Sequence, residues 1–168
     1  MKSKEIQRLC LSAMFTAVIC AATMVIQIPT PTGGYVNAGD AFILLAAVLM
    51  GPLVGMIAGG IGSALSDLLA GYMLWVPATL IIKGIMGLVA GVVFKRTKNV
   101  LLAGIPAECV MVLGYFAFEA ILVGQGLGAA AGIPGNLMQA VFGLIASTVL
   151  VRTLSRNTYL RELFPALK

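Results

Sequence analysis

The sequence contains no histidine, and only 10% of its 168 residues are charged. A soluble domain carries about 25% charged residues, so the composition excludes a soluble fold. Hydrophobic residues make up 60% of the chain, and the mean hydropathy is +1.05. Apolar runs of about 20 residues, the length that spans a bilayer, follow one another along nearly the whole chain. The composition therefore predicts an integral membrane protein.

The chain also lacks the residue combinations on which membrane enzymes and metal proteins depend. Its three cysteines, Cys10, Cys20 and Cys109, have no CxxC spacing, and without histidine they provide no ligand set for structural zinc. No G-x-x-x-x-G-K-[ST] motif is present, so the chain has no P-loop for ATP hydrolysis. We expect no catalytic residue, no metal and no cofactor. If ATP drives its function, partner subunits must hydrolyse it.

Turn residues and charges divide the chain into six apolar segments, which predict one domain of six transmembrane helices over residues 1–168. The segments are Leu9–Ile28, Gly39–Met50, Pro52–Ala70, Pro77–Phe94, Val100–Val123 and Ile133–Val151. The second is too short to cross upright, which leaves it thinned, broken or continued through the turn at Gly51. The first has the basic start of a secretory signal. Its apolar part is longer than the roughly 7–15 residues of a signal peptide, which favours a membrane helix.

Basic residues set the expected orientation of these segments. Ten of the eleven Lys and Arg residues lie before the first segment, between the fourth and fifth, or after the sixth: Lys2, Lys4, Arg8, Lys95, Arg96, Lys98, Arg152, Arg156, Arg161 and Lys168. By the positive-inside rule this side is the cytoplasm, so both termini are expected inside, in a bacterial plasma membrane. The loops Pro29–Ala38, Gly71–Val76 and Gly124–Gly132 contain no basic residue and are expected outside.

Polar side chains within the segments gather towards the expected outer side. A charge at the bilayer centre costs about 2.5–3.5 kcal/mol, so such residues face a protein interior or a wet cavity. Seven lie in the outer half, namely Gln27, Asp40, Asp67, Lys83, Glu119, Asn136 and Gln139, whereas Glu108 lies deeper. A proton or ion pathway would distribute polar groups through the full thickness. The arrangement instead predicts a cup that opens outward and is closed below.

The expected outer loops add aromatic and amide side chains around this cup. Tyr35 and Asn37 lie in the first loop, Tyr72 and Trp75 in the second, and Gln125 in the third. Aromatic rings beside polar groups suit a small, flat, heteroaromatic ligand. Tyr72 and Trp75 are equally suited to an interfacial aromatic belt.

Other interpretations of the charged residues stay open. Asp67 and Lys83 can form a structural ion pair between neighbouring helices. Asp40 can cap the N-terminus of the second helix, where a carboxylate is favourable. Asn136 and Gln139, one turn apart on one helical face, are the strongest candidates for ligand contact.

Small residues recur at helical spacing on three segments. Gly55 and Gly59, and likewise Gly87 and Gly91, are four residues apart and predict close helix packing. On the first segment, Ala13, Ala17 and Ala21 form a stripe. The stripe packs inside the molecule or offers a smooth surface for docking of another membrane protein.

The chain resembles the S components of energy-coupling factor (ECF) vitamin transporters. The resemblance rests on Ala13-x-x-x-Ala17, on the stretch VNAGD, and on the stretches GPLVGMIAGGIGSALSDLLAG, LIIKGIMGLVAG and PGNLMQAVFGL. It covers essentially the whole chain. The likeness is closest to the riboflavin-type group and, within it, to members assigned to pyridoxine or hydroxymethylpyrimidine.

The resemblance implies a substrate-binding subunit that captures a vitamin on the outer side, beneath the first outer loop. Such subunits assemble with a membrane coupling protein, the T component, and with two cytoplasmic ATPases, and Ala13 and Ala17 are expected to contact the T component. The expected substrate-binding residues are Asn37, Asp40, Asp67, Tyr72, Trp75, Lys83, Glu119, Gln125, Asn136 and Gln139. Pyridoxine or hydroxymethylpyrimidine is the expected substrate, with riboflavin as the alternative. A self-sufficient channel or secondary transporter would need an inverted repeat or a polar route through the inner half, and neither is found.

Overall fold

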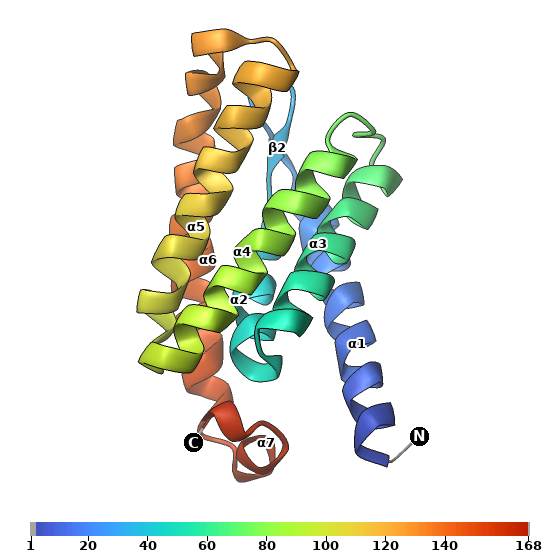
Figure 1. Cartoon of the computed structure of the whole chain (residues 1–168), viewed down its shortest axis with the longest axis vertical. Helices are drawn as coiled ribbons and strands as arrows, with labels where there is room; N and C mark the ends of the chain where they lie inside the picture. Colours follow the sequence, from blue (N-terminus) through green and yellow to red (C-terminus); the bar gives the residue numbers. More distant parts are fainter. Residues whose placement is uncertain (1–2, 168) are drawn as a thin grey trace.

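The computed structural model describes residues 3–167, so Lys2 and Lys168, which contribute to the orientation argument, lie outside the described residues. Nearly all of the described chain is helical (Figure 1). The α-helices are α1 (Ser3–Val25), α2 (Gly39–Met50), α3 (Pro52–Leu69), α4 (Val76–Thr97), α5 (Val100–Ala117), α6 (Ile133–Leu154) and α7 (Thr158–Leu163). The remaining elements are the two-residue strands β1 (Ile28–Pro29) and β2 (Tyr35–Val36), the π-helical turn η1 (Phe118–Leu122), and the 3-10 helices η2 (Gly126–Gly132) and η3 (Pro165–Leu167).

Five stretches of helix within the described residues are long and apolar enough to cross a membrane. They are Glu5–Val25, Pro52–Leu69, Val76–Thr97, Val100–Leu122 and Gly126–Leu154. Large apolar side chains such as Leu113, Ile121 and Met138 lie exposed on their outer surfaces, as lipid contact requires. The predicted all-helical, multi-pass membrane protein is therefore confirmed. The sixth expected segment is α2, which has 12 residues and is about 18 Å long.

Several boundaries differ from those expected. The first helix ends at Val25 rather than Ile28, because Ile28 and Pro29 pair with Val36 and Tyr35 in a small antiparallel hairpin. The fifth continues past Ala117 as a π-helical turn. The short α7 and η3, which the sequence pattern did not predict, bring Phe164 and Leu167 into the core at the C-terminal end.

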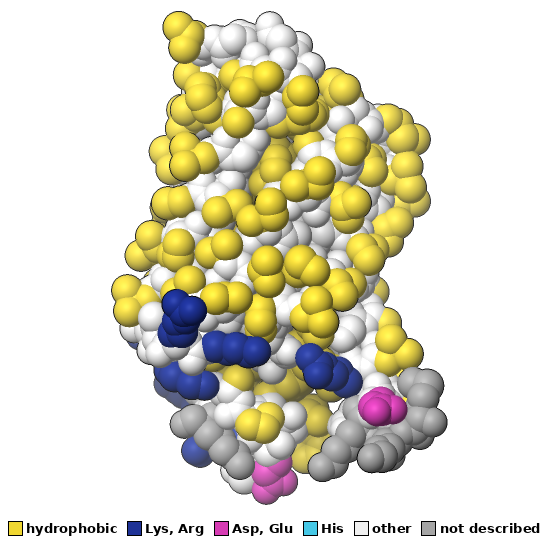
Figure 2. Space-filling view, viewed as in Figure 1, with side chains coloured by type: hydrophobic (Ala, Val, Ile, Leu, Met, Phe, Trp, Pro, Cys, Tyr) yellow, Lys and Arg dark blue, Asp and Glu magenta, His cyan; other side chains and the backbone are white. Residues whose placement is uncertain are grey.

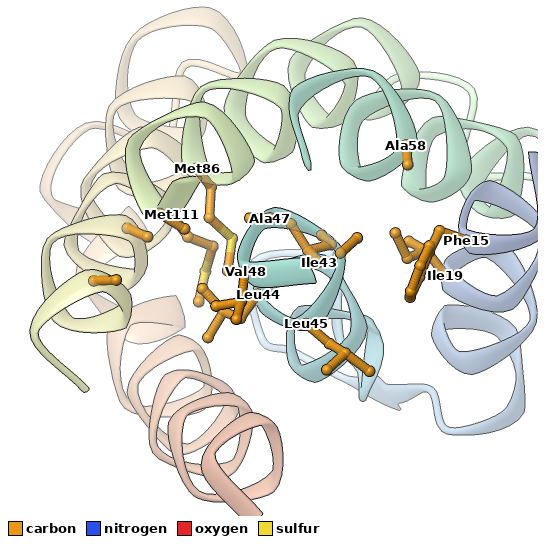
Figure 3. Packing of buried hydrophobic residues seen from close by; sticks show 14 of the residues in the cluster. Phe15, Ile19, Ile43, Leu44, Leu45, Ala47, Val48, Ala58, Met86 and Met111 are labelled. Atoms are coloured by element: carbon orange, nitrogen blue, oxygen red, sulfur yellow. The ribbon is translucent and has the colours of Figure 1, made fainter. Parts of the chain in front are cut away.

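The short helix α2 forms the centre of the bundle. It contacts α1, α3, α4, α5 and α6, and ten of its twelve residues are buried. Figure 3 shows it encircled by the other helices, with Met86 and Met111 beside Leu44 and Val48, and with Ile43 turned towards α3. Because every face of α2 meets another helix, a uniformly apolar sequence is what its position requires.

The depth of Asp40 follows from the position of α2. The helix ends at Gly51, where an added Cβ would lie 3.8 Å from the side chain of Lys95, one of the basic residues near the end of α4. Asp40 lies ten residues before Met50, so it stands about 15 Å from that end of α2. Asp40 is therefore enclosed by the bundle, with only 1% of its side chain exposed, and its position in the outer half of the membrane stays a prediction. The start of α2 is inside the bundle, below the hairpin.

The helices α3 and α4 approach each other through glycine. A Cβ added to Gly55 would lie 2.8 Å from the carbonyl oxygen of Gly87, and one added to Gly87 would overlap the backbone of Gly55. Each residue therefore has to lack a side chain for the two helices to lie this close. This is the close packing that the four-residue glycine spacing predicts.

The basic residues gather at one end of the molecule. Figure 2 shows the Lys and Arg side chains on the visible face near the end that carries α7, with hydrophobic side chains over the rest of that face. In Figure 1, α1 begins and α7 ends at this same end, and the hairpin lies towards the other. The side of the membrane that this basic end faces stays a prediction.

Candidate binding site

The loop between α1 and α2 folds over the end of the bundle remote from the basic residues. It contains the hairpin of β1 and β2, in which the backbone N–H of Thr30 donates to the carbonyl of Gly34 at 2.9 Å. Gly34 lies close to Trp75, because a Cβ added there would lie 3.3 Å from the Trp75 ring. The hairpin therefore lies directly against the start of α4.

Three hydrogen bonds from different elements hold this loop. The Tyr35 hydroxyl donates to Oδ1 of Asp67 on α3 at 2.5 Å. The side-chain amide of Gln125 donates to the carbonyl of Thr32 at 2.8 Å, and the N–H of Asn37 donates to Oε1 of Gln139 on α6 at 2.7 Å. The loop is thus fastened on three sides, by α3, by the segment before η2, and by α6.

A cavity of about 20 Å³ lies beneath the loop. Its lining consists of Thr23, Thr30, Gly34, Tyr35, Asn37, Ser63, Asp67, Trp75, Thr79, Lys83, Tyr115, Glu119 and Asn136. These residues come from α1, α3, α4, α5, α6, η1 and the loop itself. A volume of this size holds about one water molecule, so the walls must move apart before a vitamin can enter.

Beneath the cavity, a buried polar chain joins three helices. The Lys83 ammonium on α4 donates to Oδ1 of Asp40 on α2 and forms an ion pair with it. The other oxygen of Asp40 accepts a hydrogen bond from Nε2 of Gln139 at 2.6 Å. Because Gln139 also accepts from the Asn37 backbone, this chain connects the ion pair to the loop.

Aromatic rings form one wall of the cavity. The Trp75 ring packs edge-on against Phe118, with centroids 5.2 Å apart, and lies 6.3 Å from the Tyr115 ring at a tilt of 51°. Tyr115 shares a 3.0 Å hydrogen bond with Thr79, and the Lys83 ammonium lies 5.6 Å from its ring centroid. These contacts pack the wall together and place the Lys83 ammonium next to a π face.

Two acids line the cavity from elements on either side of α4. Asp67 lies near the end of α3, and its Oδ1 accepts the hydrogen bond from Tyr35. Glu119 lies in the π-helical turn η1, where the N–H of Val123 bonds the carbonyl of Phe118 at 3.1 Å. Such turns reorient side chains and often occur at functional sites. Burial raises the pKa of the Tyr35 phenol above its ordinary value, and the hydrogen bond to Asp67 raises it further.

The structure brings together most of the residues that the sequence singles out. Six line the cavity: Asn37, Asp67, Trp75, Lys83, Glu119 and Asn136. Asp40 and Gln139 lie in the polar chain below it. The Tyr72 ring packs against the Tyr35 ring at a tilt of 52°, with centroids 4.7 Å apart, and the Gln125 side chain donates to the loop at Thr32. The site assignment itself stays a prediction.

Two interpretations of the charged residues are wrong. Lys83 forms its ion pair with Asp40 and not with Asp67, because α2 lies against α4 at the level of this lysine. Asp40 makes no capping hydrogen bond at the start of α2. Instead Oδ1 of Asn37 accepts from the N–H of Gly39 at 2.9 Å.

Seven lining residues were not among the predicted site residues. They are Thr23, Thr30, Gly34, Tyr35, Ser63, Thr79 and Tyr115. Tyr115, a phenol within an apolar helix, carried a sequence signal that could have identified it. The hydroxyls of Thr23, Ser63 and Thr79 carried none, because Ser and Thr are common in membrane helices.

The alanine stripe of α1 is exposed. Ala13, Ala17 and Ala21 all face outward, while Phe15 and Ile19 on the opposite face are buried against the core. In the described chain the stripe does not pack inside the molecule, so its role as a docking surface stays a proposal.

Comparison with known proteins gives a family and several relatives. Residues 3–156 match the sequence model of the family described as ECF-type riboflavin transporter, S component. A Pyrococcus woesei protein, named "uncharacterized protein in gap 3'region", is 46% identical over 131 residues, which cover 76% of this chain and 87% of the relative. The thiamine precursor transporter HmpT of Lactococcus lactis is 32% identical over 159 residues, 94% of this chain and 93% of that protein. A UPF0397 protein of Streptococcus pneumoniae is 38% identical over 74 residues, 44% of this chain and 40% of the relative.

Proposed function

Because the chain belongs to the family of ECF-type riboflavin transporter S components, we propose that it captures pyridoxine or a hydroxymethylpyrimidine at the outer side of the cell membrane. Family membership makes it a substrate-binding transporter subunit, not an enzyme. The identity of the vitamin and the manner of its delivery are what we propose. The relative named as a thiamine precursor transporter supports a pyrimidine or a compound of similar size.

The proposal rests on the cavity that lies beneath the α1–α2 loop. Its aromatic wall of Trp75 and Tyr115 suits a flat ring, and its polar groups suit the hydroxyl, amine or ring nitrogen of a small vitamin. Residues from six helical elements and one loop converge on it. The loop must open for entry, which breaks its three hydrogen bonds with Asp67, Gln139 and Gln125.

Delivery inward is proposed to require a coupling module. The described residues contain no group of three or more metal-ligating side chains, and the chain as a whole has no P-loop motif. Because the family is that of ECF S components, we assign ATP hydrolysis to two partner ATPases and contact with the T component to the exposed residues Ala13, Ala17 and Ala21. Below the chain of Lys83, Asp40 and Gln139, the centre of the bundle consists of apolar α2 side chains, and the buried Glu108 of α5 lies beside Asp40.

Riboflavin is the second candidate, because the matching family is described by that vitamin. The test is calorimetric titration of the purified protein with pyridoxine, hydroxymethylpyrimidine, riboflavin and thiamine. We expect one of the first two to bind with a Kd below the micromolar range. Absence of any binding in that range would contradict the vitamin assignment, and uptake into sealed vesicles by this chain alone would contradict the coupling module.

A further inference from the structure

Glu108 of α5 is a buried acid that the candidate binding site does not use. Its side chain is 3% exposed, and it does not line the cavity beneath the loop. Neither Oε1 nor Oε2 of Glu108 has a hydrogen-bond partner among the described residues. A carboxylate that loses its hydration without gaining a hydrogen bond is far more costly to bury than a neutral polar group. The surroundings of Glu108 must therefore compensate its charge or remove it.

The nearby charges do not compensate this acid. A Cβ added to Gly143 of α6 would lie 2.6 Å from Oε1 of Glu108 and 3.0 Å from Cβ of Asp40, so the two acids reach the same small space. The titratable groups that act on Glu108 are Asp40 of α2, Lys83 of α4, and the neighbouring thiol of Cys109 on α5 itself. Glu108 thus adds a second acid to a cluster that contains one lysine.

The charges of this cluster balance if one of its acids holds a proton. Lys83 supplies a single positive charge and forms its ion pair with Asp40. Gln139 is neutral and bonds the other oxygen of Asp40. Were Glu108 also ionised, two carboxylates would share one ammonium and a net negative charge would remain in the interior, which is strongly unfavourable. A proton on Glu108 makes the cluster neutral.

A proton also gives Glu108 a hydrogen bond. Its side chain lies within hydrogen-bonding reach of Asp40, but two ionised carboxylates both accept and neither donates. A protonated carboxyl group has one O–H to donate. Each oxygen of the Asp40 carboxylate can accept two hydrogen bonds, and Lys83 and Gln139 occupy one position on each. The O–H of Glu108 can therefore bond Asp40 without displacing either partner.

We propose that Glu108 is a proton-binding site, and that its O–H donates to Asp40 and thereby lets this carboxylate hold Lys83 and Gln139 together. Because Gln139 also accepts from the N–H of Asn37, the bound proton acts on the α1–α2 loop through two intermediate side chains. Glu108 is therefore a positioning residue for the loop. The inference goes beyond the proposed function, since it does not depend on which vitamin enters the cavity.

The first test is infrared spectroscopy of the full-length protein in detergent near neutral pH. The carbonyl band of a protonated carboxylic acid is separate from the bands of carboxylates and amides. We expect the difference spectrum between wild type and Glu108→Gln to contain one such band. Glu162→Gln, at an exposed position on α7, is the control and should give no band of this kind. Absence of the band from the Glu108→Gln difference spectrum would show that Glu108 is ionised and would overturn the inference.

The second test measures hydrogen exchange at the loop amides of residues 30–37. Glu108→Gln keeps the size and a donor to Asp40 without a charge, so we expect exchange within ~2-fold of wild type. Glu108→Leu has no donor and should raise the exchange rates by roughly 10-fold. Thermal unfolding identifies a variant that misfolds, and Glu108→Gln decides alone if Glu108→Leu does not fold.

Two exchange results would overturn the positioning role of Glu108. One is faster loop exchange in folded Glu108→Gln, and the other is unchanged exchange in folded Glu108→Leu. Neither the infrared nor the exchange measurement uses a ligand. Failure of every vitamin to bind would therefore contradict the proposed function and leave this inference intact, whereas a missing carbonyl band would contradict this inference alone.

Discussion

Lys83 and Asp40 form an ion pair in the middle of the bundle, with their side chains only 2% and 1% exposed. The pair joins α4 to α2, and the second oxygen of Asp40 is taken by Gln139 of α6. Removal of one partner leaves a buried charge without its counter-ion, in a region where the buried Glu108 also lies beside Asp40.

Lys83→Met is expected to lower the free energy of unfolding by about 3–5 kcal/mol, because it leaves the carboxylate of Asp40 buried without its cation. Asp40→Asn should cost a similar amount, and the double variant should cost less than the sum of the two. Denaturant unfolding in detergent measures all three. Lys95→Met, at an exposed position near the end of α4, is the control and should be nearly neutral. Additive single effects would show that the two side chains are not coupled.

Gln139→Leu should weaken ligand binding by roughly 10–100-fold, since it removes the acceptor of the Asn37 N–H and the donor to Asp40 together. We expect most of the loss of affinity to come from a faster dissociation rate, because the loop loses one of the three hydrogen bonds that hold it. Stopped-flow fluorescence of Trp75, which lines the cavity, measures that rate. The neighbouring Met138, exposed on the outer face of α6, gives the control Met138→Leu. An unchanged dissociation rate in Gln139→Leu would rule out this role for the glutamine.

The sequence predicts the long helices because their apolar runs have bilayer length and end at turn residues or charges. It does not predict how α2 is placed. A segment that is apolar on every face suits contact with lipid and burial in a bundle equally well. Burial of α2, and therefore of Asp40 at its start, depends on the five helices that surround it.

Partner choice within the site also depends on tertiary structure. One lysine and several acids can be paired in more than one way, and Lys83 pairs with Asp40 only because α2 and α4 pack together. Glu119 turns towards the cavity from a π-helical turn, a local departure from the regular helix that the segment Val100–Val123 predicts. The sequence identified the acids as inward-facing from their cost in lipid, which holds regardless of these details.

Tyr35→Phe should loosen the loop, because it removes the donor to Oδ1 of Asp67 and leaves that oxygen unpaired. We expect faster hydrogen exchange at the amides of residues 30–37 and faster association and dissociation of the ligand. Tyr72→Phe is the control, since its ring can still pack against Tyr35. Equal hydrogen-exchange rates in the two variants would show that the hydrogen bond of the Tyr35 hydroxyl does not hold the loop in place.

The same phenol predicts a dependence on alkaline pH. Because the folded state raises the pKa of Tyr35 above its ordinary value of about 10, the proton stays bound in the folded protein after the unfolded chain has lost it. The stabilisation from Tyr35 is therefore complete below about pH 10 and declines as the pH rises further. Thermal unfolding of wild type and Tyr35→Phe from pH 8 to 11 should show an additional alkaline loss of stability in wild type only. Parallel curves would contradict the assignment.

Gly87→Ala should destabilise the protein by about 1–3 kcal/mol, because a Cβ at this position overlaps the backbone of Gly55 and forces α3 and α4 apart. This loss outweighs the roughly 1 kcal/mol that alanine gains over glycine in helix propensity. Gly128→Ala, where nothing lies within 4 Å of the added Cβ, is the matched control and should be neutral. Thermal unfolding in detergent measures both. A fully stable Gly87→Ala would mean that the two helices can separate without cost.

Replacement of Ala13 and Ala17 by leucine should abolish assembly with the T component and ATP-dependent uptake, while ligand affinity stays at the wild-type value. The reason is that both side chains are exposed on the face of α1 opposite to Phe15 and Ile19, so larger residues there block the approach of another helix without disturbing the core. Co-purification with the coupling module and calorimetry on the isolated subunit measure the two effects separately. Met14→Leu, exposed on a neighbouring face of α1, is the control and should preserve both. Weaker ligand binding with assembly intact would contradict a docking role for this surface.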